Sequence, residues 1–600
     1  MDIPGILTSA VNALVANGTY TFLYYDVALL AAAIVSILLA GTIVLRELSG
    51  VKRRTIMMLV LLLVVFFLVE ELFVAQTQQM YSDEYIHDGI AKNIFMDHNG
   101  GICSFSSITE CVPDTAGLFQ QPIGWATMMA SAFVVAGATF QTTFNLSMII
   151  SLLIIFLVFL LAYLLIQDEQ VALLSAVLFA ATPLFMTYAR STVLDIPSLA
   201  VSLLAICMLM VYMRQKGIRT GIAVVTCTAL ALVMKVDAII ILPIMLVMLL
   251  SYEHGFSGRR AGRQLRLFAL LAVMLLVLIS PQLAFLYNSD TTSTFGQLPG
   301  APKFSISILS NNTVPNIQFW LDSYESSNIS MPAGYYWHAE YPVVYTVLAI
   351  VGVGALLYRR RIRQASMLCI WFAIVFVFYA AYYAGSVTYG IGSDMRYYLL
   401  DFPVIAILAA VTLMYLYRAA AAALRGNGRQ AKSGRRVIMA AILLLALAEP
   451  AYQFITIVTL PTLQQAPFAA ERAGEVLDLQ NYQQVPPGCM VITFEPHFWW
   501  ILGYPNIYAS WVFTPGNWRI MQQISNGCLY FDRSVDCYIA LPPNSGYSDT
   551  QTECNQIFSN FTLQPVAVEN YTQFGWNATM GIYKVLHPNQ NFINNITTNG

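Results

Sequence analysis

The sequence predicts a polytopic α-helical membrane protein of about twelve transmembrane helices, with a small α/β domain near its C-terminus. Three observations predict this class. Of the 600 residues, 58% are hydrophobic and only 10% are charged, with a mean hydropathy of +0.64, which lies far outside the soluble range. Apolar runs long enough to cross a bilayer recur along the chain. The basic residues gather in short loops between these runs, a distribution that gives no footprint for nucleic-acid binding.

Twelve apolar runs are expected to be spans. The sixth and seventh are separated only by the charged segment around Lys235 and Asp237. A further apolar segment, 122–138, is too short for a span and is expected to be an interfacial or re-entrant helix. The expected spans lie near residues 24–45, 55–75, 143–166, 171–189, 196–213, 221–237, 238–252, 267–287, 342–358, 366–384, 397–417 and 437–459.

The loop charges orient these spans. With the N-terminus outside, most of the 30 Lys and Arg residues fall in inner loops, as the positive-inside rule requires. Residues 1–459 then form a transmembrane domain with outer loops 76–142 and 288–341, and residues 460–600 form an extracytoplasmic α/β domain. Strands are expected in that domain at Cys489–Phe494, Cys537–Leu541 and Gly581–Val585.

Cysteines and glycosylation sequons support the same orientation. Six cysteines lie in the outward regions, and an even number there favours disulfides over free thiols. Cys103 and Cys111 are the expected pair in the first outer loop, while the connectivity of the four cysteines after residue 460 stays open. Asn-x-Ser/Thr sequons also lie on the outer side, and the expected glycosylation sites are Asn311, Asn328, Asn560, Asn570, Asn577 and Asn595.

The acid pair Asp83-Glu84 follows the second span directly. On a helix, Asp83 shares a face with His87, and Tyr85 follows the pair. A carboxylate beside apolar surface has a raised pKa, which suits proton abstraction from a hydroxyl. The alternative from spacing alone is a solvated turn with an acidic helix cap.

Three further charged residues stand at span junctions. Asp195 opens the fifth span, Lys235 interrupts the sixth and seventh, and Arg396 precedes the eleventh. Ionisable residues at such places are costly and are frequently functional. Lys235 and Arg396 suit phosphate binding, whereas the alternative for each of the three is a structural ion pair with a neighbouring charge. Tyr397, beside Arg396, and His338 and Glu340, in the aromatic loop before the ninth span, suit contact with a sugar or a place in an interfacial belt.

The order of these motifs resembles a known superfamily. The acid pair precedes a Pro-containing interfacial helix at Pro122, then an Arg-x-x-x-Leu-Asp-x-Pro junction from Arg190 to Pro197, then Arg396-Tyr397 with Pro403 further on. This arrangement is similar to the C-type superfamily of integral-membrane glycosyltransferases. The nearest branch holds the protein O-mannosyltransferases and the lipid A aminoarabinose transferase.

The resemblance implies transfer of a sugar from a polyprenyl or dolichyl phosphate to a hydroxyl of a protein, lipid or glycan on the outer face, with inversion. It implies that Asp83 is the base or orients the acceptor, that Glu84 lies near the donor phosphate, and that Asp195 is a second acid. It makes Arg396 a phosphate ligand, and either Lys235 or Arg396 is the candidate substitute for the lysine of a family Lys-Pro-Pro motif. We also expect Tyr85, His87, His338, Glu340 and Tyr397 to contact substrate.

Two departures from the family pattern narrow these expectations. Gln120-Gln121-Pro122 stands where many bacterial members have Lys-Pro-Pro, and Trp499-Trp500 is followed by Ile501 rather than by the Asp of oligosaccharyltransferases. Transfer of a whole oligosaccharide to asparagine is therefore disfavoured. The motifs name no cofactor, and a divalent cation between Asp83 and Asp195 stays open, because hard cations need more oxygen ligands than the motifs supply.

A transporter or lipid flippase is the competing class, since many spans and buried charges also suit it. Against it stand the absence of an evident repeat and the large C-terminal region. An archaeal-type cell membrane is the favoured location, with a eukaryotic secretory membrane as the alternative.

Overall fold

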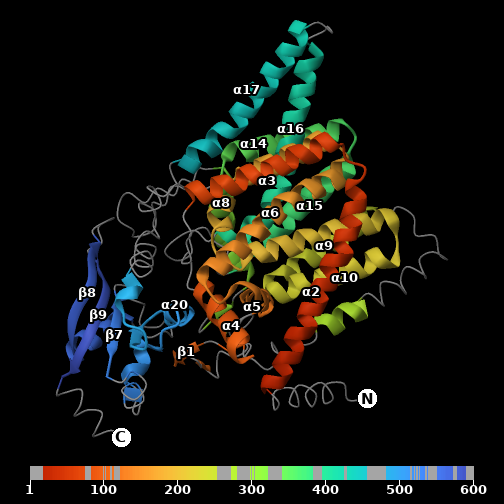
Figure 1. Ribbon diagram of the computed structural model, residues 1–600. Coiled ribbons are helices and arrows are strands. Elements are labelled where there is room, and N and C mark those ends of the chain that lie inside the picture. Colours follow the sequence, from red (N-terminus) through yellow and green to blue (C-terminus); the bar gives the residue numbers. More distant parts are fainter. Residues whose placement is uncertain are drawn as a thin grey trace.

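The structure, a computed structural model, is mostly helical with one mixed sheet (Figure 1). It describes residues 18–74, 83–98, 100–101, 103–107, 111–113, 122–252, 272–279, 297–298, 301–302, 304–321, 341–382, 395–423, 429–455, 481–513, 517–518, 521, 525, 527–533, 537, 550–571 and 578–589.

A bundle of apolar helices forms the body of the molecule (Figure 1). Every expected span coincides with helix, although only residues 272–279 of the eighth are described. By length and composition, five described helices could cross a membrane, or six if the bent pair α7–α8 is one span; the number twelve stays a prediction. The helices are α2 Gly18–Leu48, α3 Arg53–Phe73, α6 Phe140–Ile166, α7 Glu169–Ala180, α8 Pro183–Ala189, α9 Asp195–Gln215, α10 Ile218–Met234, α11 Ile241–Tyr252, α14 Val343–Tyr358, α15 Ile362–Ala380, α16 Phe402–Ala423 and α17 Arg429–Gln453.

Burial distinguishes the central helices from the peripheral ones. Helix α6 is apolar on all sides and most of its side chains are buried, as expected for a central helix. Helix α3 is also apolar, but side chains such as Leu61 and Leu72 are exposed, so this helix lies at the periphery, where lipid would cover it. The α7–α8 pair bends by 69° at Pro183, the first residue of α8, because proline has no N–H to continue the helical hydrogen bonds.

The C-terminal part of the chain contributes five strands to a seven-stranded sheet beside one end of the bundle, and the first large loop contributes the other two (Figure 1). Its centre is the parallel trio β6–β5–β7, and helix α20, Pro496–Ile501, makes the crossover that parallel β5 and β6 need. Two of the expected strands are confirmed as β5 and β9; the third, Cys537–Leu541, lies outside the described residues except for Cys537. The order is β2 (Cys111–Pro113), β1 (Cys103–Ser106), β6 (Asn506–Tyr508), β5 (Met490–Thr493), β7 (Leu529–Arg533), β9 (Ala578–Pro588) and β8 (Phe561–Tyr571).

Two disulfides fix this sheet. Cys489 pairs with Cys528, and this bond joins the residues that precede β5 and β7. Cys537 pairs with Cys554 of helix α22, Thr550–Asn560. The expectation that cysteines after residue 460 form disulfides is therefore confirmed, and its open connectivity is resolved.

The first large loop joins the bundle to the sheet. It forms helix α4, Asp83–Asp97, the hairpin β1–β2 and helix α5, Gly124–Ala136. Helix α5 occupies the short apolar segment that was expected to be helical. Strand β1 pairs antiparallel with β6, and Asn506 donates a 2.9 Å hydrogen bond to Ser106, so the loop and the sheet form one continuous structure.

Candidate functional site

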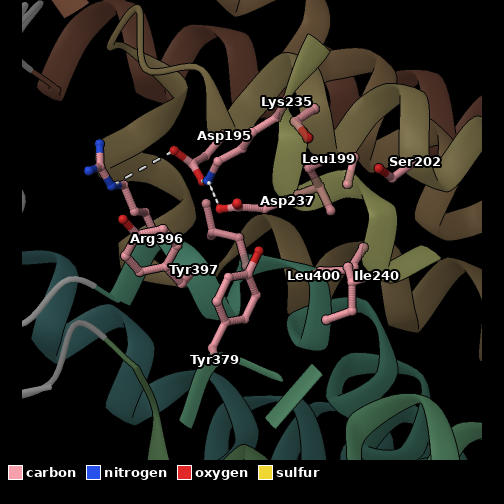
Figure 2. A pocket seen from close by; sticks show the side chains of 13 residues that line it. Asp195, Leu199, Ser202, Lys235, Asp237, Ile240, Tyr379, Arg396, Tyr397 and Leu400 are labelled. Atoms are coloured by element: carbon pink, nitrogen blue, oxygen red, sulfur yellow. Dashed lines mark hydrogen bonds and ion pairs between the residues drawn. The ribbon is translucent and has the colours of Figure 1, made fainter. Parts of the chain in front are cut away.

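Three chain breaks bring the candidate charges together (Figure 2). Asp195 is the first residue of α9. Lys235 ends α10 in an extended conformation, with φ −148° and ψ 134°, before the 3₁₀ helix η1, Val236–Ile240. Arg396 lies in the 3₁₀ helix η2, Met395–Asp401, which leads into α16. Each charge therefore stands where regular helical structure begins or ends.

Lys235 joins two carboxylates (Figure 2). Its Nζ donates a 2.6 Å hydrogen bond to Asp195 Oδ1 and lies 3.4 Å from Asp237 Oδ2. Arg396 Nε lies 4.0 Å from Asp195 Oδ2, which is an ion pair but too long for a hydrogen bond. The side chains of Asp195, Lys235 and Arg396 are 7%, 14% and 11% exposed, so solvent screens their charges only weakly. We call these four residues the Asp195 cluster.

Aromatic rings line the same hollow. The Lys235 ammonium lies 4.8 Å from the centre of the Tyr397 ring, and the Arg396 guanidinium lies 5.4 Å from it. Tyr379 of α15 packs on Tyr397 at 5.1 Å between ring centres. Rings at these distances stabilise cations that have lost much of their water. Ser198 and Ser202 of α9 add two hydroxyl groups to the lining.

An apolar cavity of about 430 Å³ lies close to the cluster. Helix α13, Ile306–Trp320, forms its wall together with α14, α15 and α16. The cavity and the cluster share α15, because Phe376 lines the cavity and Tyr379, one turn further, lines the hollow. Tyr398 contacts both rings, at 6.3 Å and 5.8 Å. A charged hollow is thus adjacent to an apolar one.

Helix α5 packs against the cluster from the first loop. Trp125 Nε1 donates a 2.9 Å hydrogen bond to the carbonyl of Thr192, three residues before Asp195. A Cβ added to Gly124 would lie 2.8 Å from the carbonyl oxygen of Val233, so only glycine allows this close approach to the end of α10. The interfacial-helix segment of the sequence is therefore part of the wall behind the site.

The acid pair begins α4, which packs on α5. Phe95 and Phe133 join the two helices, with ring centres 6.2 Å apart. The side chains of Asp83 and Glu84 lie outside the described part of the structure, so their catalytic roles stay predictions. Tyr85 and His87 are each only 1% exposed; this burial favours packing, and their predicted contact with substrate stays untested.

The other predicted residues are placed as follows. His338 and Glu340 lie outside the described residues. Cys103 and Cys111 lie in β1 and β2, but their side chains are not described, so their disulfide stays a prediction. No group of three or more His, Cys, Asp and Glu that could hold a metal ion occurs in the described part of the chain. Of the expected glycosylation sites, Asn311 and Asn570 are exposed, Asn560 ends α22, and Asn328, Asn577 and Asn595 lie outside the described residues.

One ion pair near the site was not predicted. Arg190, whose side chain is 5% exposed, lies 2.9 Å from Glu71 at the end of α3. The adjacent Glu70 is fully buried. The available signal was a second acid pair, Glu70-Glu71, at the end of an apolar run, where a charge requires a partner.

Comparisons with known proteins find a family match and matches of fold. Residues 120–285 match the family described as Dolichyl-phosphate-mannose-protein mannosyltransferase. The fold matches ArnT from Cupriavidus metallidurans in its apo state, with 14% identity and a TM-score of 0.52, over 88% of this chain and 97% of that one. The predicted resemblance to the C-type superfamily is confirmed. ArnT bound to undecaprenyl phosphate matches with 14% identity and a TM-score of 0.50, over 89% of this chain and 98% of that one.

No curated protein matches the chain by sequence. The family match spans the α5 segment, the Arg190–Pro197 junction and Lys235. The match ends before Arg396. The fold brings Arg396 to the cluster, but this residue lies outside the matched sequence.

Proposed function

We propose that this protein is a membrane glycosyltransferase that moves a sugar from a polyprenyl or dolichyl phosphate to a hydroxyl of a protein, lipid or glycan at the outer face. The observation that carries this proposal is the Asp195 cluster. It presents two cations, Lys235 and Arg396, in a hollow next to an apolar cavity. That combination suits an anionic head on a hydrocarbon chain. The fold match to ArnT, which has been solved with undecaprenyl phosphate, supports it.

Arg396 is the principal phosphate ligand in this proposal. The guanidinium can give a phosphate two parallel hydrogen bonds, and its 4.0 Å pair with Asp195 is looser than the 2.6 Å bond made by Lys235. A phosphate therefore displaces Asp195 from Arg396 at a smaller loss of ion-pair energy than it would from Lys235. The apolar cavity between α13 and α16 takes part of the isoprenoid chain, because its lining is mostly aliphatic and aromatic.

The reaction then needs a base. Asp83 accepts the proton of the acceptor hydroxyl, and the hydroxyl oxygen attacks the anomeric carbon. As the new C–O bond forms, the bond from that carbon to the phosphate oxygen breaks, and the lipid phosphate leaves with the electron pair. Attack from the opposite side inverts the anomeric centre. Arg396 and Lys235 stabilise the negative charge that develops on the leaving phosphate.

The test compares two arginines that each lie over a tyrosine ring. Arg396 lies over Tyr397 and Arg359 lies over Tyr415, at 5.4 Å and 5.0 Å from the ring centres. Purified protein in lipid receives labelled polyprenyl-phosphate sugar and crude membrane acceptor. Because a charged hydrogen bond contributes about 1.5–3 kcal/mol, Arg396→Gln should weaken donor binding about 10- to 100-fold, whereas Arg359→Gln should not change it.

Asp83→Asn should abolish transfer while donor binding, measured as the rise in melting temperature on adding polyprenyl phosphate, stays near that of the unmodified protein. Wild-type protein that moves no sugar from any such donor, or an Arg396→Gln variant with normal donor affinity, would refute the proposed function.

A further inference from the structure

Helix α20 reaches from the C-terminal sheet onto α4, the helix that begins with the acid pair (Figure 1). Phe498 packs edge-on against Tyr85, with ring centres 5.4 Å apart, and stacks on Phe140 at the start of α6 at 5.5 Å. All three aromatic side chains are buried. Phe498 therefore fills the space between the first loop and the bundle.

A glycine allows this contact. A Cβ added to Gly89 would overlap the imidazole of His497 and would lie 3.1 Å from the His497 Cβ. His497 is 5% exposed. The two helices are so close that no side chain larger than hydrogen fits at position 89 while His497 keeps its place.

Lys92 makes the third contact. Its Nζ donates a hydrogen bond to the carbonyl of Trp500 and lies 4.1 Å from the centre of the Trp500 ring. Burial lowers the pKa of Lys92 to about 8. Tyr85, Gly89 and Lys92 follow the spacing i, i+4, i+7, so they form one face of α4, and α20 covers that face.

Helix α20 is hydrogen-bonded to the sheet. Asp532 of β7 accepts hydrogen bonds from Trp499 Nε1 at 2.8 Å and from Thr493 Oγ1 at 2.9 Å. Asp532 is 1% exposed, and hydrogen bonds that a buried carboxylate accepts are strong. These hydrogen bonds attach α20 to the central strands of the sheet.

We propose that α20 is a positioning element for the acid pair, so that the C-terminal sheet takes part in sugar transfer without touching the substrate. Asp83 stands two residues before Tyr85, and α4 also packs on α5, which contacts Thr192 and Val233 beside the Asp195 cluster. Held by both α20 and α5, α4 keeps its first turn at a fixed place relative to the cluster. This inference rests on the proposed function, because it assigns α20 to the same reaction.

The experiment uses the full chain and four variants. Gly89→Ala introduces the overlap, His497→Ala removes the imidazole, and the double variant leaves only the 3.1 Å Cβ contact. Gly354→Ala is the matched control, since a Cβ on this helical glycine of α14 meets nothing within 4 Å. Donor KM, kcat and amide hydrogen exchange of residues 83–97 are measured for each.

Gly89→Ala should lower kcat at least tenfold with donor KM within twofold, and should raise exchange in α4. The double variant should recover at least half of both losses, and Gly354→Ala should match the unmodified protein. Lys92→Met provides a second probe that keeps the buried stem and removes the bond to Trp500; we expect a three- to tenfold loss of kcat with unchanged melting temperature.

Normal kcat in both Gly89→Ala and Lys92→Met would overturn the inference while leaving the proposed function intact. If the unmodified protein transfers no sugar, the proposed function fails, and hydrogen exchange alone tests whether α20 holds α4 in place. Unchanged exchange in Gly89→Ala, or no recovery in the double variant, then refutes it.

Discussion

Removing Lys235 tests the energetics of the Asp195 cluster. Lys235→Met leaves the carboxylates of Asp195 and Asp237 facing Arg396 as the remaining cation of the cluster, 4.0 Å from Asp195. Removing one partner of a buried ion pair costs about 3–5 kcal/mol, because the other charge is left without compensation. We expect about 4 kcal/mol, since Asp195 is 7% exposed and water cannot replace the lost ammonium.

Asp195→Asn should cost less. The amide oxygen still accepts from Lys235, and Lys235 keeps Asp237 at 3.4 Å. Exchanging a charged hydrogen bond for a neutral one costs about 1–2 kcal/mol. The double variant leaves no charge at either end of the 2.6 Å bond, so it should cost about 2–3 kcal/mol rather than the additive 5–6, a coupling in the range seen for contacting residues.

Thermal melting of the purified protein measures this cycle, with the order of stability expected to be unmodified protein, Asp195→Asn, double variant, Lys235→Met. Arg418 and Asp168 supply the control, because their separation is also 2.6 Å but Arg418 is 38% exposed. Arg418→Met should cost no more than about 1 kcal/mol. Additive losses in the double variant, or an equal cost for Arg418→Met, would refute the reasoning.

Three other predictions concern the rest of the structure. Burial, together with the neighbouring His87, lowers the pKa of His497 to about 3, whereas a released imidazole binds protons near pH 6.5. The protection of α4 against hydrogen exchange, relative to the intrinsic amide rate at each pH, should therefore fall as the pH falls below about 6.5, and less so in His497→Ala. Glu449 accepts hydrogen bonds from the backbone N–H groups of residues 343 and 344 at 2.9 Å and 2.8 Å; Glu449→Gln, which accepts only one, should lower stability by about 1–3 kcal/mol in thermal melting. Replacing Cys489 and Cys528 by Ser opens a link between positions 39 residues apart, and chain entropy predicts a loss of about 4 kcal/mol, measured by the same melt.

Local composition was enough to predict the helices. The run expected at 143–166 is α6, Phe140–Ile166, and the predicted interruption at Lys235 is the break between α10 and η1. Hydropathy is a property of neighbouring residues, so it locates elements without knowledge of their partners. Strands β5 and β9 were predicted for the same reason.

Partners could not be predicted in this way. An ion pair with Asp237 was the alternative to phosphate binding for Lys235, and that pair is present at 3.4 Å. A neighbouring aspartate was the alternative for Arg396, and the contact of Asp195 with both cations was not predicted. Strands β1 and β2 are four and three residues long, too short for a periodic signal, and β1 pairs with a strand from the other end of the chain. The sequence also gives no signal for the contact of Gly89 with His497, because nothing in a helical sequence indicates which neighbour a glycine will approach.

The distances within the Asp195 cluster indicate different roles for its two cations. With Lys235, Arg396, Asp195 and Asp237 ionised, the four groups sum to zero, so an arriving phosphate must draw a cation away from a carboxylate. Lys235 holds Asp195 at 2.6 Å and Asp237 at 3.4 Å, whereas Arg396 pairs at 4.0 Å. Coulomb energy falls with distance, so a phosphate separates Arg396 from Asp195 at a smaller loss of ion-pair energy than it would separate Lys235. Lys235 then neutralises both carboxylates. Substituting Arg396 should therefore lower donor affinity more than it lowers the stability of the fold. Substituting Lys235 should lower the stability of the fold more than it lowers donor affinity.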